Sequence, residues 1–220
     1  CALPIYTLFS YSGTVTNNTP TVTGIPAQYS WKLLVNPNNS KVVQLVVSNP
    51  YWDTGSPIDG VISGGTGTWN ASNTNWTSQD GKTNFAWIAN ATAMFTATPG
   101  TVTVSGTQSI GGLQFDVSGY QLSGGFLSGT VATNTLTVTN ASDSATVGSV
   151  LSGGNAWAKN GSGTLTLTGS NTYTGTMTVN AGTLVLAPAT ALTYAGSTIT
   201  IGNGTTLRVN GAGALTDRKS

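Results

Sequence analysis

Residues 161–186 read Gly161-Ser-Gly-Thr-Leu-Thr-Leu-Thr-Gly-Ser-Asn-Thr-Tyr-Thr-Gly-Thr-Met-Thr-Val-Asn-Ala-Gly-Thr-Leu-Val-Leu186. Three short runs in this stretch alternate apolar and small polar residues, which is the period-two pattern of half-buried β-strands. Turn-forming Gly, Ser and Asn separate the runs. No run is long enough to build a stable sheet of its own, so each strand must pair with strands from elsewhere in the chain.

The same phrase recurs along the chain. Gly163-Thr-Leu165 returns as Gly182-Thr-Leu184 and as Gly204-Thr-Thr-Leu207, at intervals of 19 and 23 residues between the leucines. Repeats of roughly 20 residues that carry two or three short strands are typical of β-solenoids, in which successive coils stack at ~4.8 Å. The sequence therefore predicts an all-β fold, a right-handed parallel β-solenoid, with a β-hairpin and a Trp-rich segment in its N-terminal half.

Alternate residues of each run are expected to point into the coil stack, because successive side chains of a strand lie on opposite faces of its sheet. The predicted buried ladder consists of Leu165, Leu167, Met177, Val179, Leu184, Leu186, Ile199, Ile201, Leu207 and Val209. The threonines between them are predicted to be exposed, namely Thr164, Thr166, Thr178 and Thr183.

The run from Gly163 to Leu184 resembles the autotransporter-associated β-strand repeat, also called the passenger-associated transport repeat, and the resemblance extends over residues 157–186. It departs from the family pattern at Thr176-Met177, where a second Gly or Thr and a β-branched residue are usual. The family occurs in passenger regions of bacterial autotransporters and related giant surface proteins. The resemblance implies a parallel β-helix outside the cell and implies no catalytic activity.

The resemblance also carries expectations about surroundings. It implies a secreted or cell-surface location in a Gram-negative-type bacterium, with further repeats of the same long chain as neighbours. An outer-membrane barrel or another anchor would lie outside this segment. Host or environmental glycans or surfaces are the external partners that such a passenger would meet.

Composition divides the chain into segments. Within residues 6–48 a hairpin is predicted, because Trp31, Leu33 and Val35 alternate before a five-residue break and a second alternating run at 43–47. The phrase from Gly24 to Val47 resembles segments that close a passenger unit in large surface proteins, which implies that residues 6–48 are the end of a preceding β unit. Residues 49–60 read as a linker. Residues 61–216 are predicted to be the solenoid unit, with a Trp-rich opening that resembles the start of a passenger unit.

Both termini invite a separate hypothesis. Residues 2–5 and 217–220 can be encoded by complementary strands of a common sequencing adapter, so residues 1–5 and 217–220 are interpreted as translated adapter. Cys1, the chain's single cysteine, would then be foreign to the protein. The sequence of the gene decides this, because other codons at both ends would contradict the hypothesis.

The charge content limits the classes of partner. Charged residues make up 6% of the chain, the net charge is +1, and no run of like charges occurs. Nucleic acids and anionic membranes both need clustered positive charge, so neither is an expected partner. No apolar run approaches the ~20 residues that a membrane-spanning helix requires.

Catalytic and metal-binding groups are scarce. The chain has no His and no Glu, which excludes a Ser-His-Asp triad and leaves zinc without its usual ligands. Among the six Asp residues only Asp59 and Asp80 are separated by about one coil, and we expect their carboxylates to be apart and solvated. Asp53 and Asp59 could also flank a calcium loop, but Asp is common at turns for backbone reasons alone. No catalytic, cofactor or metal site is predicted.

The aromatic residues of the Trp-rich segment leave two interpretations open. Trp69, Trp76 and Trp87 could stack on sugars, or they could cover the open end of the apolar ladder, which is the interpretation we prefer. The favoured function is accordingly a non-enzymatic passenger or stalk segment of a surface protein, with adhesion among its roles. The alternative is a carbohydrate-binding or carbohydrate-cleaving β-helix, which would need acids or aromatics clustered on a solvent-facing sheet.

Overall fold

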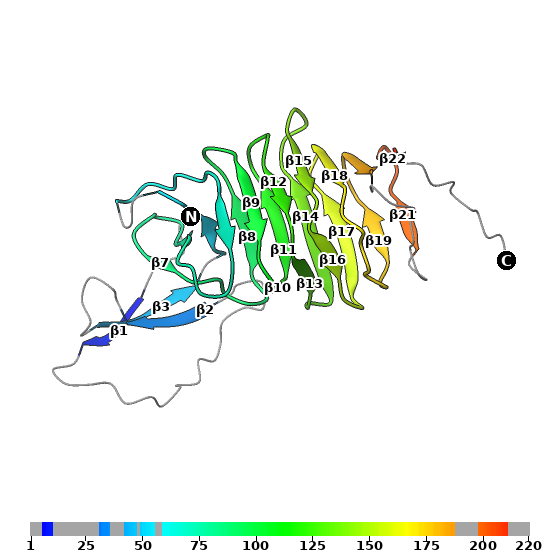
Figure 1. Cartoon of the computed structure of the whole chain (residues 1–220). Helices are drawn as coiled ribbons and strands as arrows, with labels where there is room; N and C mark the ends of the chain where they lie inside the picture. Colours follow the sequence, from blue (N-terminus) through cyan, green and yellow to red (C-terminus); the bar gives the residue numbers. More distant parts are fainter. Residues whose placement is uncertain are drawn as a thin grey trace.

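The computed structural model describes residues 6–10, 31–35, 42–47, 49–55, 59–187 and 198–210, and the first three of these segments are described by their backbone alone. Strands and turns make up this part of the chain, in which no helix occurs. No helix long and apolar enough to cross a bilayer is therefore found among these residues. Figure 1 shows the strands from β8 to β22 side by side in one elongated stack.

Three sheets form the sides of the stack, and each coil visits them in turn. Sheet I contains β4 (Tyr51–Trp52), β6 (Trp76–Thr77), β7 (Asn84–Phe85), β8 (Thr92–Phe95), β11 (Gly112–Phe115), β14 (Thr133–Val138), β17 (Ala156–Asn160), β19 (Met177–Val179) and β21 (Ile199–Ile201). Sheet II contains β5 (Gly67–Trp69), β9 (Thr101–Val104), β12 (Gln121–Ser123), β15 (Ser144–Val147), β18 (Thr164–Leu167), β20 (Thr183–Leu186) and β22 (Thr206–Val209). Sheet III contains β10 (Thr107–Ile110), β13 (Phe126–Gly129) and β16 (Val150–Ser152).

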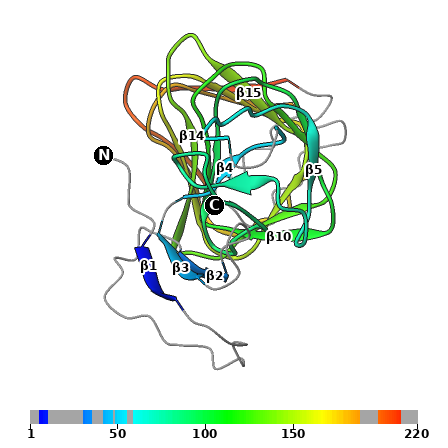
Figure 2. The same cartoon turned by 90° about the vertical axis from the view of Figure 1, so that its left-hand side faces the viewer.

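The coils stack in parallel, which confirms the predicted β-solenoid. From β8 onward, every pairing between neighbouring strands of sheets I, II and III is parallel among the described residues. Seen end-on in Figure 2, the coils surround a common interior, with β14, β5 and β10 on different sides of it. After β16 the third side continues without a strand: the Asn171 side chain accepts a hydrogen bond from the Leu151 N–H at 2.9 Å, and the N–H of Thr172 donates to the Leu151 carbonyl.

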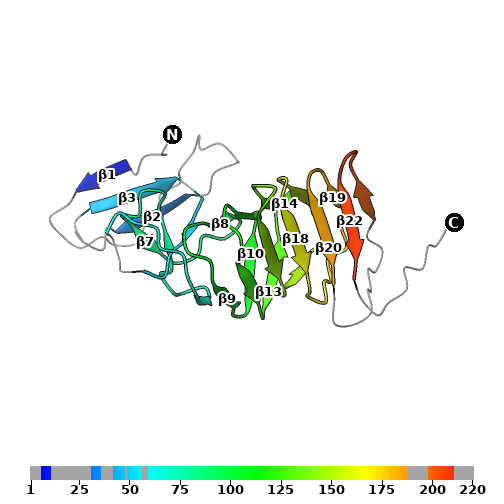
Figure 3. The same ribbon diagram turned by 90° about the horizontal axis from the view of Figure 1, so that it is seen from above.

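The expected hairpin is present. Strands β2 (Trp31–Val35) and β3 (Val42–Val47) pair antiparallel with Trp31 opposite Val47 and Val35 opposite Val43. Strand β1 (Tyr6–Ser10) pairs antiparallel with the other edge of β3. In Figure 3 this small sheet lies at the same end of the molecule as β7.

The register of the stack follows the sequence repeat. Leu165 pairs with Leu184, which pairs in turn with Leu207, and Val179 pairs with Ile201. The six ladder residues of the inner coils are buried, namely Leu165, Leu167, Met177, Val179, Leu184 and Leu186. The four of the last described coil, Ile199, Ile201, Leu207 and Val209, are not.

Two burial expectations need correction. Ile199, Ile201, Leu207 and Val209 were expected to be buried but are not, and Ile201 is 50% exposed, because β21 and β22 form the last described coil and no described strand covers them. The threonines Thr164, Thr166, Thr178 and Thr183 were expected to be exposed but are half-buried. Parallel coils at ~4.8 Å bring outward side chains of neighbouring strands into contact, so each threonine partly covers the next.

The expected linker at residues 49–60 is wrong where the structure describes it. Strand β4 pairs with β6 and β8, and Trp52 is fully buried, so this part of the segment belongs to sheet I. Pro and Gly residues suggested a linker here, but they only flank a two-residue strand. Burial of an indole ring stabilises this strand in its position. Residues 56–58, 188–197 and 211–216 of the two predicted segments lie outside the described residues.

Candidate functional site

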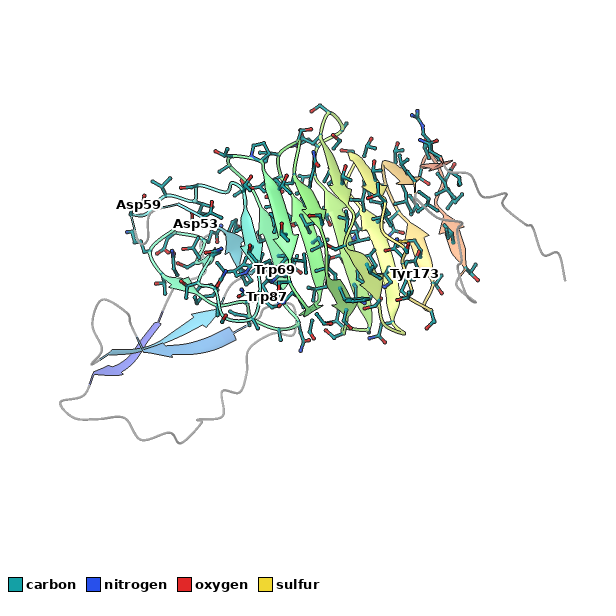
Figure 4. The ribbon with its side chains drawn as sticks, viewed as in Figure 1. Asp53, Asp59, Trp69, Trp87 and Tyr173 are labelled. Atoms are coloured by element: carbon teal, nitrogen blue, oxygen red, sulfur yellow. The ribbon has the colours of Figure 1, made fainter. Side chains whose placement is uncertain are left out.

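Aromatic rings fill the N-terminal end of the solenoid. Trp69 lies 4.8 Å from Trp76 and 4.7 Å from Trp87 between ring centroids, and Trp52 lies 5.1 Å from Trp76. Most of these pairs meet edge-to-face, which is a favoured geometry for aromatic rings. Phe95 joins the cluster and stacks on Phe115 of the next coil at 5.0 Å. Figure 4 shows the labelled Trp69 and Trp87 close together inside this end.

The tryptophans are buried, which corrects their interpretation as ligand-contacting aromatics. Trp69 and Trp76 are 0% exposed and Trp87 is 8% exposed, so no ring face is available to stack on a sugar. Trp69 opposes Val104 in the register of sheet II and therefore occupies an inward position of the ladder. The cluster thus seals the end of the apolar ladder, the role that the cap interpretation gives it.

The same segment covers strand edges. The Trp87 Nε1–H donates to the Ser109 carbonyl of edge strand β10 at 2.9 Å, and the Asn90 N–H donates to the same carbonyl at 3.0 Å. The Asn75 side-chain amide donates to the Thr68 carbonyl of edge strand β5 at 3.2 Å. Unpaired edges invite pairing with other chains, and these contacts blunt them at the N-terminal end of sheets II and III.

The exposed carboxylates are engaged in their own turns. The Asp59 Oδ1 accepts the Val61 N–H at 2.8 Å, and the Asp80 Oδ1 accepts the Ser78 hydroxyl at 2.6 Å. Both residues are exposed, as expected, although their loops are joined by a hydrogen bond from the Gly60 N–H to the Gly81 carbonyl. Because the nearby tryptophans are buried, the two acids do not face an aromatic groove.

Asp53 closes a loop at the same end. Its side chain is buried, and Oδ1 accepts the N–H groups of Gly55 and Ser63, each at 3.1 Å. The second oxygen, Oδ2, has no hydrogen-bond partner in the structure. Within the described ranges, no three His, Cys, Asp or Glu side chains come together as a metal site would require.

Lys159 is a buried charge that the sequence reading missed. It occupies an inward position of β17, opposite Leu136 on one side and Val179 on the other. The ammonium donates to the carbonyls of Asn160, Gly161 and Ala181 at 3.0, 2.8 and 3.0 Å. Burial lowers the pKa of Lys159 from 10.5 to about 8, because the interior disfavours the charged form. The sequence held one indication of this inward position: Lys159 lies two residues after Trp157, which points inward, and alternate residues of a strand share a face.

One outward aromatic lies on sheet III. Phe126 of β13 is 47% exposed, and every other aromatic side chain that the structure describes is buried or half-buried. Its outward neighbours across the sheet are Thr107 and Val150, and the second outward column consists of Ser109, Ser128 and Ser152. The outward face of sheet III therefore combines an aromatic ring and hydroxyl groups without any charged residue.

Comparison with known proteins places these features in a family context. The model of the passenger-associated transport repeat matches residues 158–186. The chain is 41% identical over 176 residues to the adhesin BmaC autotransporter of Brucella suis biovar 1 (strain 1330), an alignment that covers 78% of this chain and 5% of that protein. The chain thus spans about a twentieth of the length of this relative. No solved structure matches the chain.

Proposed function

The chain belongs to the autotransporter passenger family that carries this repeat, and we propose that it is a non-enzymatic stalk unit of a secreted or surface-displayed bacterial passenger, with an adhesive outer face. The repeat at residues 158–186 and the similarity to an autotransporter adhesin support this assignment. The single structural observation that carries it is the stacking of repeat on repeat: Leu165, Leu184 and Leu207 form one inward column of sheet II, and the tryptophan cluster fills the N-terminal end of the same stack.

A stalk of this kind extends by adding coils. Further repeats of the same long chain are therefore the proposed partners, and an outer-membrane anchor of a Gram-negative-type bacterium would lie elsewhere in that chain. Each added coil would cover the apolar ladder of the coil before it, as Leu184 covers Leu165. The wall built in this way is nearly free of charge, which suits contact with uncharged surfaces.

The proposed adhesive face is the outward side of sheet III. Phe126 offers an apolar ring, and the serines beside it offer hydroxyl donors and acceptors. The C–H face of a pyranose ring packs on aromatic carbon while its hydroxyls need polar partners, so a neutral glycan matches both features. The absence of charged residues from this face argues against ionic ligands.

Adhesion is tested with the whole chain coupled to beads and applied to immobilised neutral glycans. We expect Phe126→Ser to weaken retention about five-fold, which corresponds to about 1 kcal/mol for one aromatic contact. Binding should change little between about 0.05 M and about 0.5 M salt, because no ion pair is involved. Val61→Ser is the matched control, since Val61 is exposed at 56% on the cap and not on sheet III. Equal losses in the two variants, or binding abolished by salt, would contradict the adhesive face.

The carbohydrate-cleaving alternative predicts turnover, and we expect none. Hydrolysis of a glycosidic bond needs two carboxyl groups facing each other across it, and Asp59 and Asp80 each serve a separate turn. The chain should therefore release no reducing sugar from a panel of plant, fungal and bacterial polysaccharides. Release that disappears in Asp80→Asn would overturn the non-enzymatic assignment.

A further inference from the structure

Lys159 interrupts an otherwise apolar column. The inward column of sheet I runs through Leu113, Leu136, Lys159, Val179 and Ile201, as the pairings of successive strands show. The Lys159 side chain is fully buried. A lysine ammonium has three N–H donors, and here all three are used by carbonyl oxygens.

The three carbonyls belong to two different coils. Asn160 and Gly161 form the turn that follows β17, whereas Ala181 lies in the turn that follows β19, one coil later. These turns are in close contact, since a Cβ atom added at Gly182 would approach the Gly161 carbonyl oxygen to 2.7 Å. The ammonium can therefore reach its third partner only while β19 stacks directly on β17.

The apolar ladder by itself distinguishes poorly between registers. Ala145, Leu165, Leu184 and Leu207 form one inward column of sheet II, and the outward column beside it is Ser144, Thr164, Thr183 and Thr206. If β22 paired with β18 instead of β20, and β21 with β17 instead of β19, leucine would still lie inward and threonine would still face outward. Such a one-coil slip leaves one coil out of the stack but still packs leucine on leucine where the slip occurs, so a repeat of this kind needs another feature to exclude it.

We propose that Lys159 fixes the register of the coils, by making the stacking of β19 on β17 the arrangement that satisfies its buried ammonium. In the slipped arrangement the turn carbonyl of Ala181 is removed and the ammonium is left with an unsatisfied donor inside the stack. A buried charge without its partners is strongly unfavourable, whereas an apolar residue at the same place is tolerated in both arrangements. Lys159 therefore lowers the stability of the fold somewhat, while it makes one register of the coils more favourable than the others.

The destabilisation that the buried charge causes depends on pH in a definite direction. Lys159 binds its proton less tightly in the folded chain, where its pKa is about 8, than in the unfolded chain, where 10.5 applies. Between these values the unfolded state binds more protons, so stability rises with pH. The elements stacked on β17 within sheet I, β14 and β19, contain no titratable residue, and neither do β18, β20 or the turns at 160–163 and 180–182. The melting temperature should rise from about pH 8 to about pH 9.5, and Lys159→Met should remove this rise.

Cross-linking measures the register directly. In a Cys1→Ser chain, the pair Thr164→Cys and Thr183→Cys reports the native stacking, because these residues are opposite each other in β18 and β20. The pair Thr164→Cys and Thr206→Cys lies two coils apart in the structure and becomes adjacent only after a one-coil slip. Each chain is refolded from denaturant at neutral pH and treated with a short thiol cross-linker.

With Lys159 present, we expect the native pair to cross-link and the slipped pair to remain near background. Lys159→Met should raise cross-linking of the slipped pair at least about ten-fold, and Lys82→Met, which removes an exposed lysine, should not. Where Lys159→Met does not refold, the slipped pair is compared in the parent chain refolded at about pH 7 and about pH 10, since a neutral amine has one donor fewer. Unchanged cross-linking of the slipped pair in either comparison would show that Lys159 is a tolerated buried charge without influence on register.

Discussion

Leu184→Asp should unfold the chain at a much lower urea concentration than the parent, with a loss of about 3 to 5 kcal/mol in the free energy of unfolding. Leu184 is fully buried and is paired with Leu165 on one side and Leu207 on the other. An aspartate there would place a charge among apolar side chains of three coils. Circular dichroism across a urea titration measures the midpoint and the slope together.

Thr183→Asp is the matched control for this change. Thr183 precedes Leu184 in β20, faces outward and is half-buried, so a new carboxylate there remains in contact with water. We expect a loss below about 1 kcal/mol, as for ordinary surface substitutions. Similar midpoint shifts for the two variants would mean that the assigned inward and outward faces of β20 are wrong.

Trp69→Ala should destabilise the chain by about 3 to 5 kcal/mol, because it removes the central ring of the cap and leaves a cavity. Trp69 lies within 5 Å of both Trp76 and Trp87 between ring centroids, so its loss would loosen the whole cluster. Phe126→Ala, which truncates a 47% exposed ring, is the control and should cost far less. The melting temperatures of the two variants provide the comparison. Equal losses of stability would show that the tryptophans do not cap the stack.

Conservative variants separate packing from hydrogen bonding in the same cluster. The Trp69 indole N–H has no hydrogen-bond partner, whereas the Trp52 N–H donates to the Gly65 carbonyl at 2.8 Å. Trp69→Phe therefore removes volume alone, and Trp52→Phe also leaves the Gly65 carbonyl without its partner. We expect Trp52→Phe to cost about 1 kcal/mol more than Trp69→Phe.

The sequence was sufficient to predict the solenoid and its register where the repeat is regular. The spacing of the Gly-Thr-Leu phrases predicted the pairing of Leu165, Leu184 and Leu207, because successive coils of a solenoid are expected to stack in the order of the sequence. Strand β4 was not predictable from the same pattern. A two-residue strand has no periodicity, and only the packing of Trp52 against the cluster reveals it.

The features that bear on function were harder to predict, for physical reasons that differ. Tryptophan has both a stacking face and a large apolar surface, so composition could not decide whether Trp69 and Trp76 were exposed or buried. The buried position of Lys159 could not be predicted, because a lysine on a strand normally faces solvent. Its inward position depends on three carbonyl oxygens that converge only after two coils have stacked.

The central claim is that the coils stack in parallel in the order of the sequence, and methyl-to-methyl nuclear Overhauser effects test it most directly. In a chain with labelled leucine methyl groups, Leu184 is predicted to show contacts with both Leu165 and Leu207, because it lies between them in one column. Leu165 and Leu207 are predicted to show none with each other, since a full coil separates them. A contact between Leu165 and Leu207, or the absence of both contacts to Leu184, would contradict the β-solenoid described here.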